Sequence, residues 1–204
     1  MPVQTKPLVL ASASPRRRDI LEQLGLAFEV IVSAVDEPER EAEAPDAYAR
    51  GLAARKADAV VARLEAEGGR AGAFVLGADT IVVIDGRVLN KPTDDADAVR
   101  MLMALSGNQH TVITAVALRF AHDAAFERTI AVRSGVRFRA FDRATAQRYA
   151  ASGEGRDKAG SYAVQGLGAG LVRAIDGSYS NVVGLPACET LELLIDAGVL
   201  GAWP

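Results

Sequence analysis

The sequence predicts an α/β fold in which helices flank a mixed β-sheet. Short apolar runs typical of strands are interleaved with segments of helical periodicity, and the two do not alternate strictly, so parallel and antiparallel strands are both expected. Half of the 204 residues are hydrophobic, which suffices for one sizeable core or for two small lobes around a cleft. No internal repeat or low-complexity segment divides the chain, so we predict a single domain over residues 1–204.

The first predicted element is a strand over residues 7–11, which leads through a turn into a helix. Apolar residues then recur at helical spacing up to Gly25. Ser14 is expected to cap this helix, and Pro15 at the first helical position loses no hydrogen bond. A second strand is expected over residues 28–32.

A hairpin and a helix are predicted next. The stretch AFVLGADTIVVIDGRVLNKP, residues 73–92, contains two strand-like runs joined at Asp85-Gly86, a dipeptide that suits a type I′ turn. Thr93 is then expected to cap a helix over residues 94–105.

The second half of the chain begins with two strand-like runs and ends with a helix. The runs cover residues 110–120 and 126–141, and we expect them to pair. Asp142 is expected to cap a helix that ends at Ala151, and a glycine-rich segment follows. The last helix is expected over residues 188–198, with apolar positions at Leu191, Leu194 and Ile195.

Composition argues against several classes of function. The 23 Lys and Arg residues are balanced by 26 Asp and Glu residues, and the net charge of -3 predicts no binding to nucleic acid. One cysteine rules out an internal disulfide, and two histidines disfavour a Cys/His zinc site. No apolar run approaches the roughly 20 residues that span a bilayer, and no signal peptide is recognisable, so we expect no membrane association and a cytoplasmic location.

Glycine motifs for nucleotide binding are absent or weak. The Walker sequence G-x-x-x-x-G-K-[ST] does not occur. The pattern GLGAG at residues 166–170 has no convincing strand before it, so we assign it no dinucleotide role.

The turn after the first strand reads SASPRR and concentrates positive charge at a helix start. A helix amino terminus offers free N–H donors and a partial positive charge, and Arg16 and Arg17 add full charges there. These charges oppose the helix dipole unless an anion compensates them. Two interpretations stay open: a phosphate site, or solvated surface arginines.

Lys56 lies on the apolar stripe of a long helix expected over residues 47–65. The apolar positions around it, at 100° per residue, are Ala49, Leu52, Ala53, Val60 and Leu64. Such a lysine either snorkels to water at the edge of the stripe or is a buried cation that faces an anionic ligand.

Asp79 interrupts the apolar run FVLGADTIVVI, where a carboxylate needs a cation, a metal or several donors. The hairpin register places Thr80 opposite Lys91, so Lys91 arrives beside Asp79. The two charges form either a structural salt bridge or part of a site. In the acidic stretch DEPERE, Glu37 is a weaker candidate, and Asp36 is its nearest rival.

These regions supply cations for an anion and carboxylates for a hard metal. The residues are Arg16, Arg17, Lys56, Lys91, Asp79 and Glu37. Such a set suits phosphate-ester chemistry, in which a divalent ion and fixed cations offset the charge of a polyphosphate while a carboxylate activates or orients water.

A series of motifs runs along nearly the full length of the chain: SASPRR, DE at 36–37, ARKA around Lys56, GADTIV, NKP, LSGNQHTVITAVAL, DKAGSYAVQG and GSYSNVVGLP. In these motifs the sequence resembles the Maf family of nucleoside triphosphate pyrophosphatases. The resemblance implies the inosine triphosphate pyrophosphatase-like (Maf/Ham1) fold, with a mixed sheet, flanking helices and a central cleft. It also implies hydrolysis of a nucleoside triphosphate to the monophosphate and pyrophosphate with a divalent cation, Mg or Mn.

The resemblance implies roles for the candidate residues. Asp79 would be the proton acceptor or a metal-linked carboxylate, and Glu37 would support the cation. Lys56 and Lys91 would hold phosphates.

The resemblance also implies a substrate-binding set. Its members are Ser12, Ser14, Arg16, Arg17, Thr80, Lys158 and Gln165. Arg16, Thr80 and Gln165 match the positions that discriminate the base, and Arg17 is expected nearer phosphate. A fork of arginine donors and the Gln165 amide suit the carbonyls of a pyrimidine.

Within the family, SPRR together with DKAGSYAVQG resembles members that act on dTTP and UTP. Relatives that act on 7-methyl-GTP tend to carry an aromatic residue at the position of Arg16. Small residues at Ser161 and Ala163 leave the fine selectivity open. The family is also associated with arrest of septum formation, so a nucleotide-binding regulator without essential catalysis is the alternative. Family precedent allows a homodimer.

Overall fold

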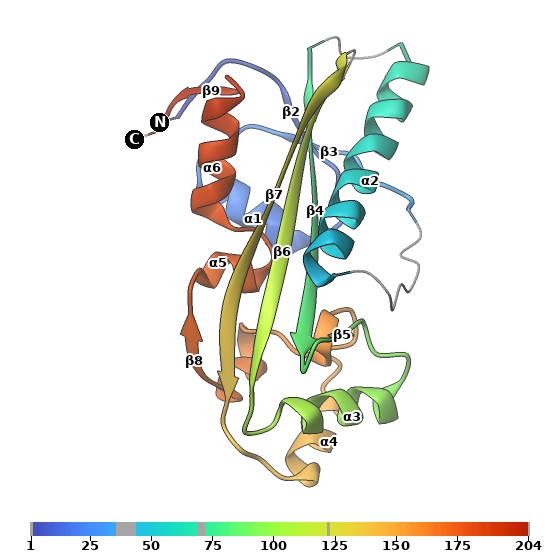
Figure 1. Ribbon diagram of the computed structural model, residues 1–204, viewed down its shortest axis with the longest axis vertical. Helices are drawn as coiled ribbons and strands as arrows, with labels where there is room; N and C mark the ends of the chain where they lie inside the picture. The colour runs from blue at the N-terminus through green and yellow to red at the C-terminus, as the bar shows by residue number, and fades with distance from the viewer. Residues whose placement is uncertain (1, 36–43, 69–71, 122, 204) are drawn as a thin grey trace. The chain divides into compact units, whose positions relative to one another are not determined.

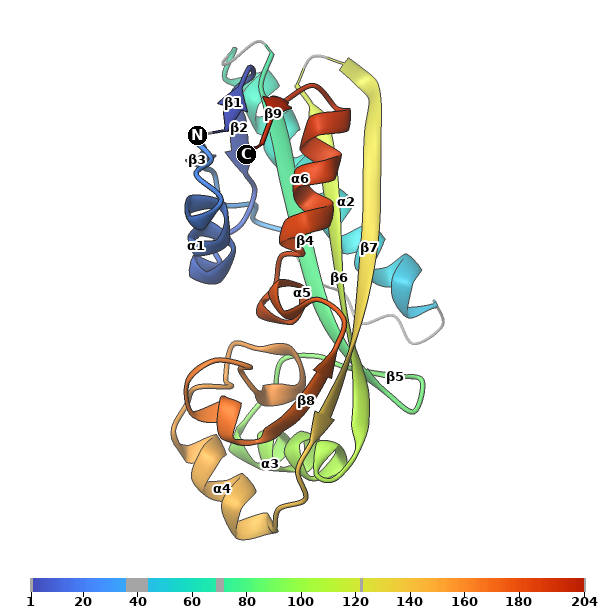
Figure 2. The ribbon, with the colours of Figure 1, turned by 90° about the vertical axis from the view of Figure 1, so that its left-hand side faces the viewer.

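The computed structural model describes residues 2–35, 44–68, 72–121 and 123–203 (Figure 1, Figure 2). Its strands are β1 (Val3–Gln4), β2 (Leu8–Leu10), β3 (Glu29–Val30), β4 (Phe74–Ile84), β5 (Arg87–Leu89), β6 (Gln109–Phe120), β7 (Asp123–Phe138), β8 (Val172–Asp176) and β9 (Leu200–Ala202). The larger sheet has the order β3-β2-β4-β6-β7-β8, with β5 paired to β4, and β1 pairs with β9. Because β2 is parallel to β3 and β4 while β5 and β8 pair antiparallel, the predicted mixed sheet is confirmed.

Helices flank the sheet, as the sequence predicted. They are α1 (Pro15–Gln23), α2 (Pro45–Ala66), α3 (Asp95–Leu105), α4 (Arg143–Ala151), α5 (Tyr179–Val183) and α6 (Ala187–Asp196), with the 3₁₀ helices η1 (Ala159–Ser161) and η2 (Gly166–Gly170). In the part of the chain that the structure describes, none of the helices combines the length and the apolar character that crossing a bilayer requires.

The chain divides into two compact units, of which the first comprises Met1–Asp79, Thr114–Val132 and Gly184–Pro204. In this unit α2 and α6 lie on opposite faces of the sheet (Figure 1, Figure 2). The contact between α2 and β4 is close at Gly77, where an added Cβ would lie 2.3 Å from the carbonyl oxygen of Ala53. Glycine is therefore required at this point of β4.

The second unit comprises Thr80–Ile113 and Arg133–Val183. Side chains of α3 and α4 pack with β6 and β7 into an apolar core that includes Leu102, Leu105 and Phe138. His110 lies buried in this core, and its ring meets the Phe138 ring edge-to-face with centroids 5.0 Å apart. Its Nε2 is 2.8 Å from the hydroxyl of Tyr162.

The predicted hairpin is confirmed. Asp85 and Gly86 both have positive φ, 49° and 75°, as a type I′ turn requires. The register pairs Ile84 with Arg87, Val83 with Val88 and Val82 with Leu89, where β5 ends. The predicted pairing of Thr80 with Lys91 lies beyond the end of β5.

Three local predictions are wrong. Ser14 occupies the N-cap position of α1, but its side chain makes no capping hydrogen bond. The cap of α3 is Asp94, which accepts from the Asp97 amide at 2.7 Å, rather than Thr93. Ile195 is 40% exposed, because it lies beyond the edge of the buried face of α6.

Candidate active site

The turn between β2 and α1 holds Arg17 in the interior of the first unit. Arg17 Nε donates to the carbonyl oxygen of Gly184 at 2.8 Å, and Nη1 donates to Ser12 Oγ at 3.1 Å. The Ser14 amide also donates to Ser12 Oγ, at 3.2 Å. A hydroxyl has two acceptor lone pairs, so with both occupied Ser12 can meet a ligand only as a donor. Such a donor suits an anion.

The two arginines of SPRR therefore differ. Arg17 is buried, so the interpretation as a solvated surface arginine is wrong for this residue. Arg16 is only half-buried. No acidic residue occupies the first turn of α1, and this turn therefore presents positive charge from the helix dipole together with the arginines.

Lys56 and Asp79 form an ion pair in the interior of the first unit. Lys56 Nζ lies 2.6 Å from Asp79 Oδ1, and the two side chains are 12% and 7% exposed. Lys56 lies on α2 and Asp79 on β4, which approach each other closely at Gly77. The snorkelling interpretation of Lys56 is therefore wrong. Lys56 is therefore a cation that pairs with Asp79, and the pairing of Asp79 with Lys91 that the hairpin register predicts stays a prediction.

Burial makes the Lys56–Asp79 pair costly to break. Loss of one partner of a buried pair leaves an uncompensated charge and costs about 3–5 kcal/mol. An ionised carboxylate only accepts hydrogen bonds, so Asp79 in this pair can orient a water and take its proton.

Parallel strand pairing brings the turn and the ion pair to the same end of the first unit. Leu10 pairs with Leu76, and both Ser12 and Asp79 follow this pair toward the carboxyl ends of their strands. The chain after β3 reaches this end as well, since Ser33 Oγ donates to the carbonyl oxygen of Ala11 at 3.5 Å. Glu37 follows soon after Ser33 and lies outside the described residues, as does Asp36.

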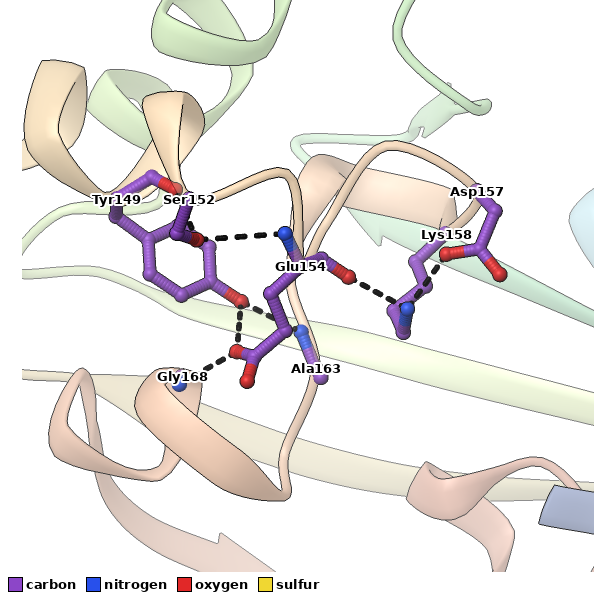
Figure 3. Close-up of polar contacts among 7 residues, drawn as sticks. All are labelled: Tyr149, Ser152, Glu154, Asp157, Lys158, Ala163 and Gly168. Carbon is purple, nitrogen blue, oxygen red and sulfur yellow. Dashed lines mark hydrogen bonds and ion pairs between the residues drawn. The ribbon is translucent and has the colours of Figure 1, made fainter.

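The second unit carries the remaining predicted residues. Thr80 follows Asp79 directly in β4 and is half-buried, whereas Lys91 and Gln165 are exposed. Lys158 Nζ donates to the carbonyl oxygen of Glu154 and to Asp157 Oδ1, both at 2.5 Å (Figure 3).

Two further residues of this unit, Glu154 and Tyr149, hold the segment that carries Gln165, and the sequence did not single them out. Their hydrogen bonds reach Ala163, Leu167 and Gly168. The available signal was a lone acid between two glycines in SGEGR, directly after a predicted helix.

A divalent cation would find few protein ligands in the described ranges. No group of three or more His, Cys, Asp or Glu side chains that could hold a metal occurs among these residues. Asp79 supplies one carboxylate. Mg²⁺ is commonly held by one or two carboxylates together with substrate phosphates, so Asp79 fits such an ion in combination with a bound nucleotide.

The mixed sheet, its flanking helices and a donor-rich turn at the same end as a buried Lys–Asp pair define a protein suited to an anionic ligand. The family described as Maf-like protein matches residues 7–197, and the chain belongs to the Maf family.

Individual relatives cover almost the whole chain. A protein of Shewanella oneidensis named dTTP/UTP pyrophosphatase is 49% identical over 198 residues, which cover 95% of this chain and 99% of that protein. A protein of Myxococcus xanthus with the same name is 47% identical and covers 96% of this chain and 95% of its own length. A solved HAM1 protein of Coxiella burnetii aligns over 66% of this chain and 73% of its own, with 18% identity and a TM-score of 0.42.

Proposed function

We propose that this chain hydrolyses nucleoside triphosphates, dTTP and UTP foremost, to the monophosphate and pyrophosphate, and so clears nucleotide pools. The observation that carries the proposal is the buried Lys56–Asp79 pair at the same end of the first unit as the Ser12–Arg17 turn. Membership of the Maf family and the dTTP/UTP pyrophosphatase names of its relatives support it. We place the reaction in the cytoplasm.

In the proposed reaction a water attacks the α-phosphorus and the bond to the oxygen that bridges to the β-phosphorus breaks. Asp79 takes one proton of the water, and pyrophosphate leaves with the bridging oxygen. Lys56 holds Asp79 in place from α2 and contributes positive charge beside it. The Ser12 hydroxyl and the first turn of α1 offer donors and positive charge to phosphate oxygens.

We also propose a divalent cation, Mg²⁺ or Mn²⁺, held by Asp79 with support from Glu37. Bound with the nucleotide, it would neutralise phosphate charge. Lys56 and Lys91 are assigned to phosphates in the same proposal, Arg16, Thr80 and Gln165 are assigned to the base, and Lys158 is assigned to the substrate. A homodimer is proposed from family precedent alone.

The test is hydrolysis of a panel of natural and modified nucleoside triphosphates with Mg²⁺ or Mn²⁺, in which the phosphate product is identified. We expect pyrophosphate, with dTTP and UTP preferred, and a loss of about 10²–10⁴-fold in kcat for Asp79→Asn. The matched control is Asp58→Asn, which removes a carboxylate that pairs with Arg119 at 2.7 Å elsewhere in the first unit. This control should retain most activity.

The other outcomes distinguish the alternatives. Orthophosphate as the product would overturn the reaction. Pyrophosphate mainly from 7-methyl-GTP would keep the reaction and overturn the assignment of Arg16 to a pyrimidine base. A folded protein that binds nucleotides without hydrolysing any of them would favour the nucleotide-binding regulator of septum formation.

A further inference from the structure

The first amides of the 3₁₀ helix η2 are capped by a side chain from another part of the chain rather than by the side chain of the N-cap residue. Gln165 occupies the N-cap position, yet its side chain is exposed and makes no capping hydrogen bond. The first amides of a helix need acceptors. Glu154, from the turn after α4, supplies them: Oε1 accepts from the Leu167 amide and Oε2 from the Gly168 amide, each at 2.8 Å (Figure 3 shows the Gly168 bond).

Tyr149 extends this contact to the other side of Gln165. Its hydroxyl donates to Glu154 Oε2 at 2.7 Å and accepts from the Ala163 amide at 3.0 Å (Figure 3). Tyr149 itself is anchored, because it lies on α4 with its ring buried in the core of the second unit. The backbone is therefore held at Ala163 before Gln165 and at Leu167 and Gly168 after it. We call Glu154 and Tyr149 the loop clamp.

The glycines of GLGAG are explained by the loop clamp. Gly166 has φ +64°, and a Cβ there would lie 2.1 Å from Glu154 Oε1. A Cβ on Gly168 would lie 2.0 Å from the carbonyl oxygen of Ala163 and 2.7 Å from the Tyr149 hydroxyl. At Gly170, beyond the loop clamp, an added Cβ meets nothing within 4 Å. The first two glycines thus permit the close approach of Glu154 and Tyr149.

The protonation states suit this arrangement. Burial raises the pKa of Glu154, but hydrogen bonds from Tyr149, Gly168 and Leu167 lower it more, so the net pKa lies below the usual value. Burial raises the pKa of the Tyr149 phenol, which therefore keeps the proton that it donates. At neutral pH the carboxylate only accepts and the phenol donates, as the distances require.

We propose that Glu154 and Tyr149 are positioning residues for nucleotide selection, which fix the backbone on both sides of Gln165 so that its exposed amide reads the base from one place. The inference rests on the proposed function and on the role proposed there for Gln165. Because Glu154 caps η2, the Gln165 side chain is left to face a ligand. Discrimination between bases by hydrogen bonds depends on such placement, since a displacement of a group by about 1 Å can lower the reaction rate about 10²-fold.

The first test measures the loop clamp without any nucleotide. Hydrogen exchange of the Ala163, Leu167 and Gly168 amides is compared between the wild-type protein and its Glu154→Ala, Glu154→Gln and Tyr149→Phe variants. Exchange should accelerate about 10-fold or more in Glu154→Ala and less in Glu154→Gln, which keeps one acceptor oxygen. Tyr149→Phe keeps the buried ring and should release mainly Ala163, so it remains informative if Glu154→Ala fails to fold.

The second test measures selection. The ratio of kcat/KM for dTTP to that for ATP should fall about 10- to 100-fold in Glu154→Ala, mainly through KM, because binding rather than the chemical step loses a contact. Gln165→Ala should show the same loss, and the double variant should lose no more than either single variant. Glu127→Gln, which removes an exposed carboxylate elsewhere, should leave the ratio and the amide exchange unchanged.

The outcomes separate this inference from the proposed function. Unchanged exchange in Glu154→Ala and Tyr149→Phe would overturn the loop clamp. Faster exchange with an unchanged selectivity ratio, or additive losses in the double variant, would overturn the positioning role while hydrolysis stands. A wild-type protein that hydrolyses no nucleoside triphosphate would overturn the proposed function and the positioning role with it, whatever the exchange data show about the loop clamp.

Discussion

The proposed catalytic pair and the proposed base-reading segment are held in opposite ways. Lys56 and Asp79 are buried side chains on a helix and a strand, and they are held by each other. Gln165 has an exposed side chain. Hydrogen bonds to Glu154 and Tyr149 hold the backbone amides on either side of it. A group that takes a proton gains from fixed, buried surroundings, whereas a group that reads a base has to meet the ligand. At Gln165 only the backbone is therefore held, and the side chain stays exposed.

This comparison predicts that substitutions in the Lys56–Asp79 pair lower stability and activity together. Substitutions in the segment around Gln165 should instead lower the selectivity among nucleotides. The largest effect is expected for Lys56→Met, which leaves the Asp79 carboxylate buried without the cation seen 2.6 Å away. The free energy of unfolding should fall by about 3–5 kcal/mol, measured by urea denaturation, and pyrophosphate release should fall with it.

The matched control is Arg63→Met on the same helix. Arg63 pairs with Glu67 at 2.8 Å, but both side chains are more than half exposed, at 57% and 55%. An exposed pair of this kind contributes about 0.2–1 kcal/mol. Equal losses in the two variants would contradict the view that burial sets the importance of the Lys56–Asp79 pair.

Lowering the pH tests a buried titratable group in the second unit. Burial lowers the pKa of His110 to about 4, whereas an unfolded histidine titrates near 6.5. Between these values the unfolded chain binds a proton that the folded chain does not, so the free energy of unfolding should fall by about 1.4 kcal/mol per pH unit as the pH drops from about 6.5 to 4. Above about pH 6.5 both states are neutral, and this contribution is fully present.

Urea unfolding at several pH values measures this slope in the wild-type protein and in His110→Gln. Gln does not titrate and keeps a polar partner for Tyr162, so the variant should lose less stability per pH unit. The acidic groups are common to both proteins, and the difference between the slopes therefore reports His110. Identical slopes would contradict a buried neutral histidine.

Gly77→Ala tests the packing that brings Lys56 to Asp79. The new Cβ would lie 2.3 Å from the backbone of Ala53 and 2.8 Å from that of Ala57, so α2 has to move away from β4. We expect a loss of about 1–3 kcal/mol in stability together with reduced hydrolysis. In Gly51→Ala the added Cβ meets nothing within 4 Å, and this control on α2 should be about 0.5–1 kcal/mol more stable than the wild-type protein.

The smallest effect on turnover is expected for Gly168→Ala, in which the added Cβ would lie 2.0 Å from the carbonyl oxygen of Ala163 and displace the backbone near Gln165 from Ala163 and Tyr149. Its preference for dTTP over ATP should fall about 10-fold or more while kcat for dTTP changes little. Gly170→Ala, with open space around the added Cβ, is the control and should keep the preference. A drop in kcat with an unchanged preference for dTTP over ATP would contradict the distinction between the Lys56–Asp79 pair and the segment around Gln165.

Much of the fold was predictable because the deciding interactions are local. The Asp85-Gly86 turn follows from the backbone preferences of two residues. Asp142 caps the helix α4, because its side chain accepts from the Thr145 amide three residues away. The buried stripe of α2 follows from helical periodicity. The cap of α1 was not predictable in this way: Ser14 stands at the N-cap position, yet its side chain makes no capping hydrogen bond.

The sequence by itself determined the mixed α/β class, most element positions, the family resemblance and the candidate residues of the site. Only the tertiary structure decided their partners: Lys56 for Asp79, 23 residues apart, and Gly184 for Arg17, 167 residues apart. It also revealed Glu154 and Tyr149 beside Gln165. The physical reason is that periodicity and turn preferences act over a few residues, whereas the partner of a buried charge depends on which distant elements pack against it.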